Sequence, residues 1–116
     1  EFRSVPAGQY AQQVFEKLDL LGPLRSKFVF GNNVRNVLSA VESGNADLGI
    51  VYETDAELSD RVQVMTAASK NTHSPIVYPI AIVESSPNPD AAQVFIDFLS
   101  SESAQTHFEA FGFGKL

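Results

Sequence analysis

Residues 28–52 read FVFGNNVRNVLSAVESGNADLGIVY, which predicts a strand, a helix and a second strand. The apolar triplet 28–30 is typical of a strand, and Gly31-Asn32-Asn33 supplies a turn and then a helix cap. Apolar residues follow at helical spacing up to Gly44, where the helix is expected to end. Residues 48–52 form a second apolar run, as expected of a buried strand. Because parallel strands need a crossover helix between them, this order predicts an α/β fold.

The segments before and after residues 28–52 continue the predicted alternation of helices and strands. A helix is expected over Ser4–Leu20, with Pro6 in its first turn and Gly22-Pro23 as its stop. Further strands are expected over 62–65 and 76–83. Two last helices, beginning after Asn88 and after Ser101, carry an apolar, largely aromatic stripe made of Phe95, Phe98, Leu99, Phe108 and Phe111.

Composition narrows the class of protein. The 116 residues suit one compact domain, and 44% hydrophobic residues, including nine Phe, suffice for a core. Fourteen acidic and eight basic residues give a net charge of −6, which makes the chain a poor candidate for binding nucleic acid. The chain has no Cys, which excludes disulfides and thiolate metal sites. Any anion that it binds must therefore be held by local dipoles rather than by net charge.

Three short motifs together indicate a cradle of neutral hydrogen-bond donors for a small oxyanion. Two open helices and the third ends a strand; they are Val5-Pro6-Ala7-Gly8-Gln9-Tyr10, Asn32-Asn33-Val34-Arg35-Asn36-Val37-Leu38 and Leu48-Gly49-Ile50-Val51-Tyr52. A helix start leaves backbone N–H groups without partners inside the helix and carries about half a positive charge. Two converging helix starts therefore bind an anion without Lys or Arg. Singly, each motif fits an ordinary helix start or a core tyrosine.

In wording and spacing the motifs resemble the periplasmic molybdate-binding proteins of ABC importers. The end of the chain is similar too, with Tyr78-Pro79-Ile80-Ala81-Ile82-Val83 and Phe111-Gly112-Phe113. The resemblance covers essentially the whole chain. It implies that a tetrahedral dianion, molybdate or tungstate, accepts hydrogen bonds from the backbone N–H groups of Ala7 and Val34 and from the hydroxyl of Tyr52. No other cofactor or metal is expected.

The same resemblance implies a partial class II periplasmic-binding fold. Residues 1–75 then belong to the second lobe and carry half of the oxyanion site, while residues 76–116 form a crossover strand and C-terminal helices that pack on a first lobe. That first lobe, which holds the family's remaining serine donors, is expected to be largely absent from these residues. Its place is expected to be taken by the missing N-terminal half or by a second copy in an exchanged dimer. The expected partner is a membrane permease, and the expected location is periplasmic or otherwise extracytoplasmic, with a lipid anchor left open.

Other functions remain as alternatives. The fold is compatible with another oxyanion such as sulfate, or with an effector-binding domain of a regulator. Catalysis is not expected, because the two histidines, His73 and His107, suit a solvated surface and no nucleophile or phosphate-loop motif is present. Asp55 and Glu57 are expected on a solvated helix face rather than at a metal. Arg35 follows Val34 and lends a positive field there, without being assigned as a ligand.

Overall fold

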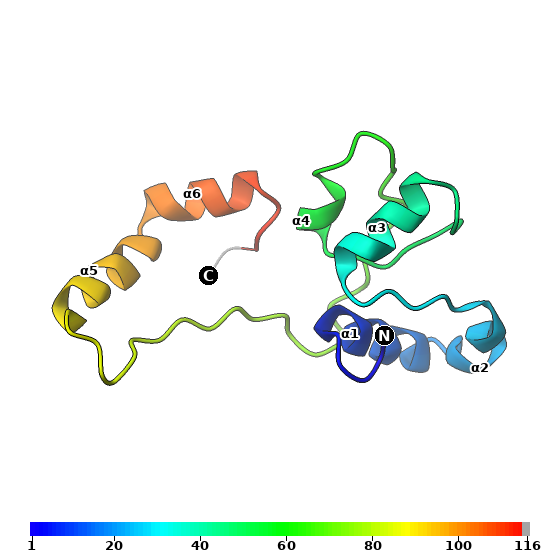
Figure 1. Ribbon diagram of the computed structural model, residues 1–116, viewed down its shortest axis with the longest axis horizontal. Helices are drawn as coiled ribbons and strands as arrows, with labels where there is room; N and C mark the ends of the chain where they lie inside the picture. The colour runs from blue at the N-terminus through cyan, green and yellow to red at the C-terminus, as the bar shows by residue number, and fades with distance from the viewer. Residues whose placement is uncertain (115–116) are drawn as a thin grey trace. The chain divides into compact units, whose positions relative to one another are not determined.

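The computed structural model describes residues 1–114 (Figure 1). Its helices are α1 (Pro6–Lys17), α2 (Leu21–Leu24), the 3-10 helix η1 (Arg25–Lys27), α3 (Val34–Glu42), α4 (Glu53–Ala56), α5 (Pro89–Leu99) and α6 (Glu102–Ala110). The chain separates into two compact units, the first from Glu1 to Pro75 and the second beginning at Ile76. Each unit is described by itself.

The expected strands are not formed within the described residues. Segments 28–30, 48–52, 62–65 and 76–83 carry no strand pairing and run as irregular chain (Figure 1). A strand exists only when a neighbouring backbone pairs with it, and these segments have no such neighbour in residues 1–114. Many of their residues are accordingly exposed, among them Val29 and Leu48 at 78% each. The helical part of the α/β prediction is confirmed, whereas residues 1–114 contain no sheet.

The first unit is organised around α1. Ala7 and Ala11 are buried along one face of this helix. Phe28 joins it to the N-terminal segment, because its ring lies 5.4 Å from Phe2 and 5.0 Å from Phe15. The helix ends at Lys17 rather than at Leu20, since Asp19 adopts a positive φ of 56° and turns the chain. The predicted stop, Gly22-Pro23, lies inside the short helix α2.

Helix α3 follows its predicted pattern. Its apolar positions, Val34, Val37, Leu38 and Val41, are all partly buried. Gly44 lies just beyond the helix with φ of 72°, as a terminating glycine should. The 48–52 run lies against this apolar face at Gly49, where an added Cβ would come within 2.9 Å of the side chains of Val37 and Val41. The absence of a side chain at Gly49 therefore allows the run to approach α3.

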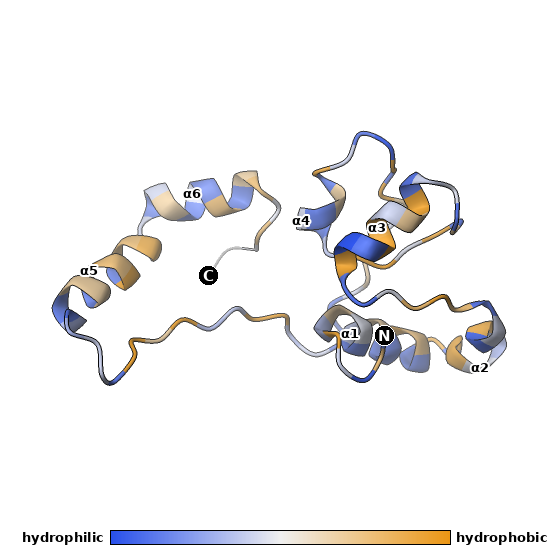
Figure 2. Ribbon diagram, in the orientation of Figure 1, coloured by the Kyte–Doolittle hydropathy of each residue, from blue (hydrophilic) through white to orange (hydrophobic). Residues whose placement is uncertain are grey.

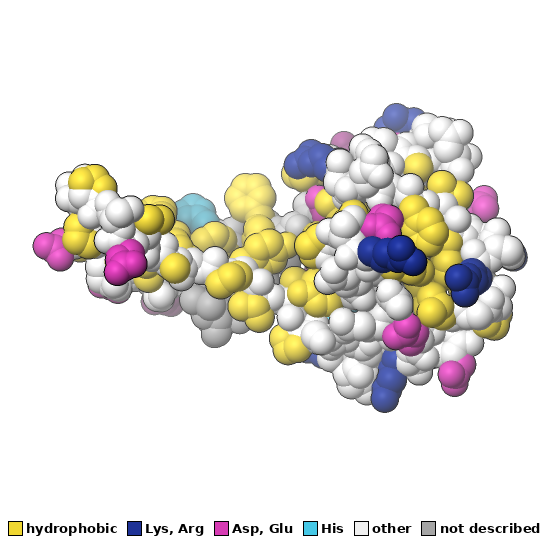
Figure 3. All heavy atoms as spheres, turned by 60° about the horizontal axis from the view of Figure 1, so that its bottom comes forward, with side chains coloured by type: hydrophobic (Ala, Val, Ile, Leu, Met, Phe, Trp, Pro, Cys, Tyr) yellow, Lys and Arg dark blue, Asp and Glu magenta, His cyan; other side chains and the backbone are white. Residues whose placement is uncertain are grey.

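In the second unit, helices α5 and α6 pack on each other through few buried groups. Ser101 caps α6 by accepting a hydrogen bond from Ala104 N–H at 3.3 Å, and Gln105 Nε2 donates to the Leu99 carbonyl at 2.8 Å. Ala104 is buried, but the aromatic stripe is largely open to solvent, with Phe95 56% and Phe98 52% exposed. Helix α5 is mostly hydrophobic (Figure 2), and hydrophobic side chains reach the molecular surface widely (Figure 3). None of the helices in residues 1–114 has the length and apolar character that a membrane span requires.

Candidate functional site

The first predicted donor, Ala7, lies in the opening turn of α1. The cap position is Val5, which provides no side-chain acceptor, and Pro6 has no N–H. The first hydrogen bond of the helix is the one from Gln9 N–H to the Val5 carbonyl, at 3.1 Å. The N–H groups of Ala7 and Gly8 therefore belong to the turn in which a helix has no acceptors of its own. The local sequence places both donors at the positive end of the helix dipole.

The second predicted donor, Val34, is the first residue of α3. The side chain of Asn33 caps this helix by accepting a hydrogen bond from Asn36 N–H at 2.8 Å, while the Asn33 carbonyl accepts from Val37 N–H at 3.3 Å. The cap thus satisfies the third and fourth amides of the helix and leaves the first two, those of Val34 and Arg35, to other acceptors. The Arg35 side chain is exposed.

The third predicted donor, Tyr52, lies where the 48–52 run meets α4. It is the N-cap residue of α4, with an extended backbone at φ of −75° and ψ of 154°, and its side chain is partly buried. Its N–H donates to Asp55 Oδ2 at 3.3 Å, and its carbonyl accepts from the N–H groups of Asp55 at 3.0 Å and Ala56 at 3.2 Å. Both polar atoms of the Tyr52 backbone are therefore engaged by the first turn of α4.

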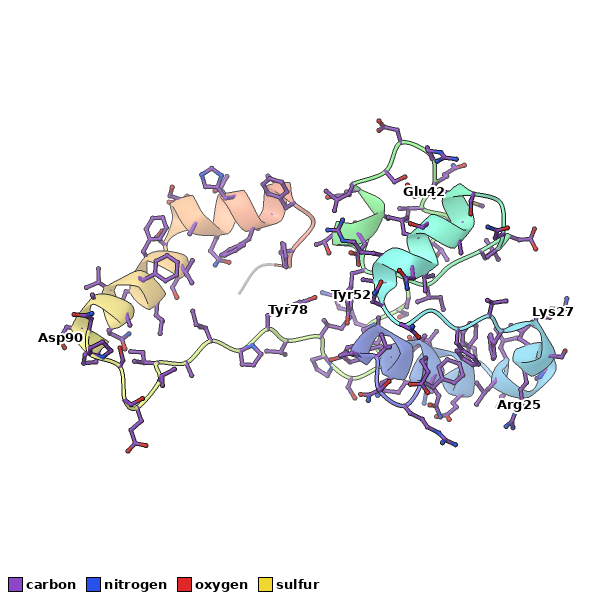
Figure 4. All side chains as sticks on the ribbon, in the orientation of Figure 1. Arg25, Lys27, Glu42, Tyr52, Tyr78 and Asp90 are labelled. Atoms are coloured by element: carbon purple, nitrogen blue, oxygen red, sulfur yellow. The ribbon has the colours of Figure 1, made fainter. Side chains whose placement is uncertain are left out.

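All three predicted donors lie in the first unit, and two close approaches connect their elements. The N-terminal ammonium of Glu1 donates to the Gly31 carbonyl at 3.0 Å, and the backbone of Glu1 also lies against Gly8 in the first turn of α1. Gly31 in turn lies against Val37 of α3. Glu1 therefore joins the starts of α1 and α3, while Gly49 and α4 bring the Tyr52 run onto α3. Figure 4 shows Tyr52 between α1 and α3 in this view.

The segment just before α1 already holds an oxyanion, the side chain of Glu1. This carboxylate accepts hydrogen bonds from the Ser4 hydroxyl at 2.6 Å, Ser4 N–H at 2.9 Å and Arg3 N–H at 3.1 Å. These donors, the Ser4 hydroxyl foremost and then the Arg3 amide, hold the pKa of Glu1 below its usual value. Neutral donors at residues 3 and 4, together with the nearby positive N-terminus, therefore favour the charged form of this carboxylate.

One expectation about an ionisable residue is wrong. Asp55 was expected on a solvated face, but it is only 9% exposed, because its carboxylate turns back to Tyr52 N–H. His73 is at the surface in a loop, as expected, and is partly covered, with its ring 6.0 Å from that of Tyr10 and its Nδ1 2.8 Å from the Ser74 carbonyl. His107 is exposed, as expected. An acidic residue three positions after a helix cap is the capping-box pattern, which is the signal that identifies Asp55.

The first unit has a surface hollow that is not lined by any of the three predicted donors. Its volume is about 540 Å³, and it is lined by Gln13, Glu16, Lys17 and residues 71–74, at the C-terminal half of α1. Ser74 N–H donates to Gln13 Oε1 across it at 2.6 Å. Within residues 1–114, no three His, Cys, Asp or Glu side chains gather in a way that would hold a metal ion.

Comparison with known proteins assigns the chain to a family. Residues 2–114 match the family described as bacterial extracellular solute-binding protein. The chain is 46% identical over 110 residues to YvgL of Bacillus subtilis (strain 168), which is assigned as an ABC transporter substrate-binding lipoprotein. It is 38% identical over 109 residues to the molybdate-binding protein ModA of Haemophilus influenzae and 37% identical over 109 residues to ModA of Escherichia coli (strain K12).

One solved structure has a backbone fold similar to that of this chain. It is a substrate-binding domain assigned to a molybdenum ABC transporter of Clostridium difficile, with a TM-score of 0.89 and 46% sequence identity. The match covers 100% of this chain and 51% of the solved one. The alignments to YvgL and to the two ModA proteins cover 94–95% of this chain but only 42% of each relative, so the chain spans less than half the length of these relatives. The chain belongs to the bacterial extracellular solute-binding protein family.

Proposed function

We propose that this chain is part of the solute-binding component of an ABC importer, and that its solute is molybdate or tungstate. The observation that carries the proposal is the pair of helix starts in the first unit, α1 and α3, which both leave first-turn N–H groups open and are joined through Glu1 and Gly31. The relatives named as molybdate-binding proteins give the solute class. Ala7 N–H, Val34 N–H and the Tyr52 hydroxyl are the proposed donors.

The chemistry of these donors suits a dianion. Every oxygen of molybdate or tungstate accepts hydrogen bonds, and the three proposed groups donate them. A protonated phosphate needs an acceptor as well, which such a site does not offer. Sulfate has the same charge and a similar shape, so size is the remaining basis for discrimination. Helix dipoles and amides rather than net charge attract the anion, because the chain itself carries a charge of −6.

The remainder of the receptor supplies the other side of the site in this proposal. The first unit, as part of the second lobe, contributes one set of donors, and closure of the first lobe over the anion completes the set. The second unit, with Phe95, Phe98 and Phe111 more than half exposed, presents the apolar surface on which that lobe packs. An N-terminal half of the same protein is the proposed cover, and a second copy of the chain is the alternative.

The relatives are described as binding components, which supports transport rather than catalysis as the proposed function. The proposed macromolecular partner is the membrane permease of the importer, which recognises the closed receptor. The proposed location is outside the cytoplasm, either free in a periplasm or held by a lipid, since YvgL is described as a lipoprotein.

A thermal-shift series on the complete receptor tests this function. The receptor is heated alone and with molybdate, tungstate, sulfate or phosphate at the same concentration. A ligand present at about 100 times its dissociation constant stabilises the folded state by about 2.7 kcal/mol, which is readily detected as a higher melting temperature. We expect molybdate and tungstate to raise it and phosphate to leave it unchanged. A response to sulfate alone would replace the proposed solute, and no response to any of the four would remove the oxyanion function.

A further inference from the structure

We infer that Asp55 is a positioning residue, which holds Tyr52 so that its phenolic hydroxyl points into the oxyanion site. This inference rests on the proposed function, because it concerns the aim of one proposed donor. Asp55 itself makes no contact with the anion in this scheme. Its task is to fix the backbone from which the Tyr52 side chain projects.

The contacts between Asp55 and Tyr52 run in both directions. Asp55 Oδ2 accepts from Tyr52 N–H at 3.3 Å, and Asp55 N–H donates to the Tyr52 carbonyl at 3.0 Å. A second amide, that of Ala56, reaches the same carbonyl at 3.2 Å. The peptide groups on both sides of the Tyr52 Cα are thus bonded to one helical turn. Because φ and ψ of a residue set the direction of its Cα–Cβ bond, these bonds restrict the direction of the phenol.

The burial of Asp55 indicates that its contact with Tyr52 is a specific structural interaction. Only 9% of the residue is accessible, although a carboxylate loses much of its hydration when it is buried. By contrast, the acidic residue Glu57, two positions later in the same segment, is exposed. A buried carboxylate is tolerated where its oxygens accept hydrogen bonds, and Tyr52 N–H is such a donor for Asp55.

The charge of Asp55 argues that geometry, not electrostatics, is its contribution. A negative group close to a bound dianion repels it, so the charge by itself does not favour the ligand. The useful property is the acceptor oxygen at the correct distance from the backbone of Tyr52. Asn at this position retains an acceptor oxygen and removes the charge, whereas Ala removes both. These two substitutions therefore separate the roles of the oxygen and the charge.

A double-mutant cycle in the complete receptor tests the inference, with molybdate affinity measured by isothermal titration calorimetry. The variants are Asp55→Ala, Tyr52→Phe and the two combined, with Asp55→Asn as the conservative variant and Glu57→Ala as the matched removal of a nearby exposed carboxylate. We expect Asp55→Ala to weaken binding about tenfold when Tyr52 is present, and less than about twofold in the Tyr52→Phe background, because the hydroxyl that Asp55 aims is then gone. Asp55→Asn and Glu57→Ala should remain within about twofold of the parent.

The outcomes of the cycle are distinct. Equal losses from Asp55→Ala with and without the Tyr52 hydroxyl would show that Asp55 only supports the fold, and would overturn the inference. An unchanged affinity in Asp55→Ala would overturn it as well. If Tyr52→Phe alone leaves the affinity unchanged, the proposed donor itself is wrong, which is a different failure. Should Asp55→Ala not fold, Asp55→Ser makes the same test, since its hydroxyl oxygen is one bond closer to the backbone than the carboxylate oxygens and does not reach Tyr52 N–H.

Discussion

Substitution of Gly8 by Ala tests how the start of α1 is joined to the start of α3. A Cβ at Gly8 would lie 2.1 Å from the Glu1 carbonyl oxygen and 2.7 Å from the Glu1 carbonyl carbon. Both are backbone atoms, so they cannot move aside by a simple side-chain rotation. The backbone of Glu1 must move by more than about 1 Å to restore an ordinary contact.

The expected magnitude follows from two contributions. Overpacking of a tight contact costs about 1–3 kcal/mol. Replacing Gly by Ala within a helix returns up to about 1 kcal/mol through its better helix propensity. We therefore expect the free energy of unfolding of the receptor to fall by up to about 3 kcal/mol. Molybdate affinity should fall too, because the bridge between the two donor ends of α1 and α3 is displaced.

Urea unfolding and calorimetric titration of the complete receptor measure these two effects. Gly22→Ala is the matched control: a Cβ there meets nothing within 4 Å, so the same change should be neutral or slightly stabilising. Gly44→Ala distinguishes steric clash from backbone strain, because a Cβ at Gly44 would meet no neighbouring atom but the residue has a positive φ of 72°. If Gly8→Ala proves as stable as Gly22→Ala and binds molybdate equally well, the proposed connection through Glu1 is wrong.

Three further predictions concern the donors and their supports. Tyr52→Phe should weaken molybdate binding about 10- to 150-fold in the complete receptor, the range for losing a hydrogen bond to a charged group, and an unchanged dissociation constant by calorimetry would remove Tyr52 from the site. Asn33→Ala should lower the stability of the receptor by about 1 kcal/mol in urea unfolding, because α3 loses its cap. Asn33→Asp should keep the cap but weaken dianion binding through its negative charge. Equal stability of the parent and both variants would refute the role of the cap. The 116 residues alone should bind molybdate at least about a hundredfold more weakly than the complete receptor, since at least two donors are then lacking, and full-strength binding by this chain would contradict a site built from two lobes.

Local signals in the sequence predicted the helix starts well. Pro6 marks the first residue of α1, Asn33 caps α3, and Gly44 terminates α3 with a positive φ. Each of these features depends on residues within a few positions of one another, so the sequence contains the whole cause.

Features that depend on distant residues were predicted poorly. The 28–30 and 48–52 runs have strand composition, yet a strand requires a partner that residues 1–114 do not provide. The contact between His73 and Tyr10 joins residues more than sixty positions apart, and no local pattern indicates it. Asp55 is the intermediate case, because its spacing from Tyr52 signals a cap but not the burial of the carboxylate.

A crystal structure of the complete receptor with bound molybdate tests the central claim most directly. The account predicts that the backbone nitrogens of Ala7 and Val34 and the hydroxyl oxygen of Tyr52 each lie about 2.7–3.2 Å from an oxygen of the same anion. An anion bound elsewhere, with these three groups turned to solvent or to other partners, would contradict the account.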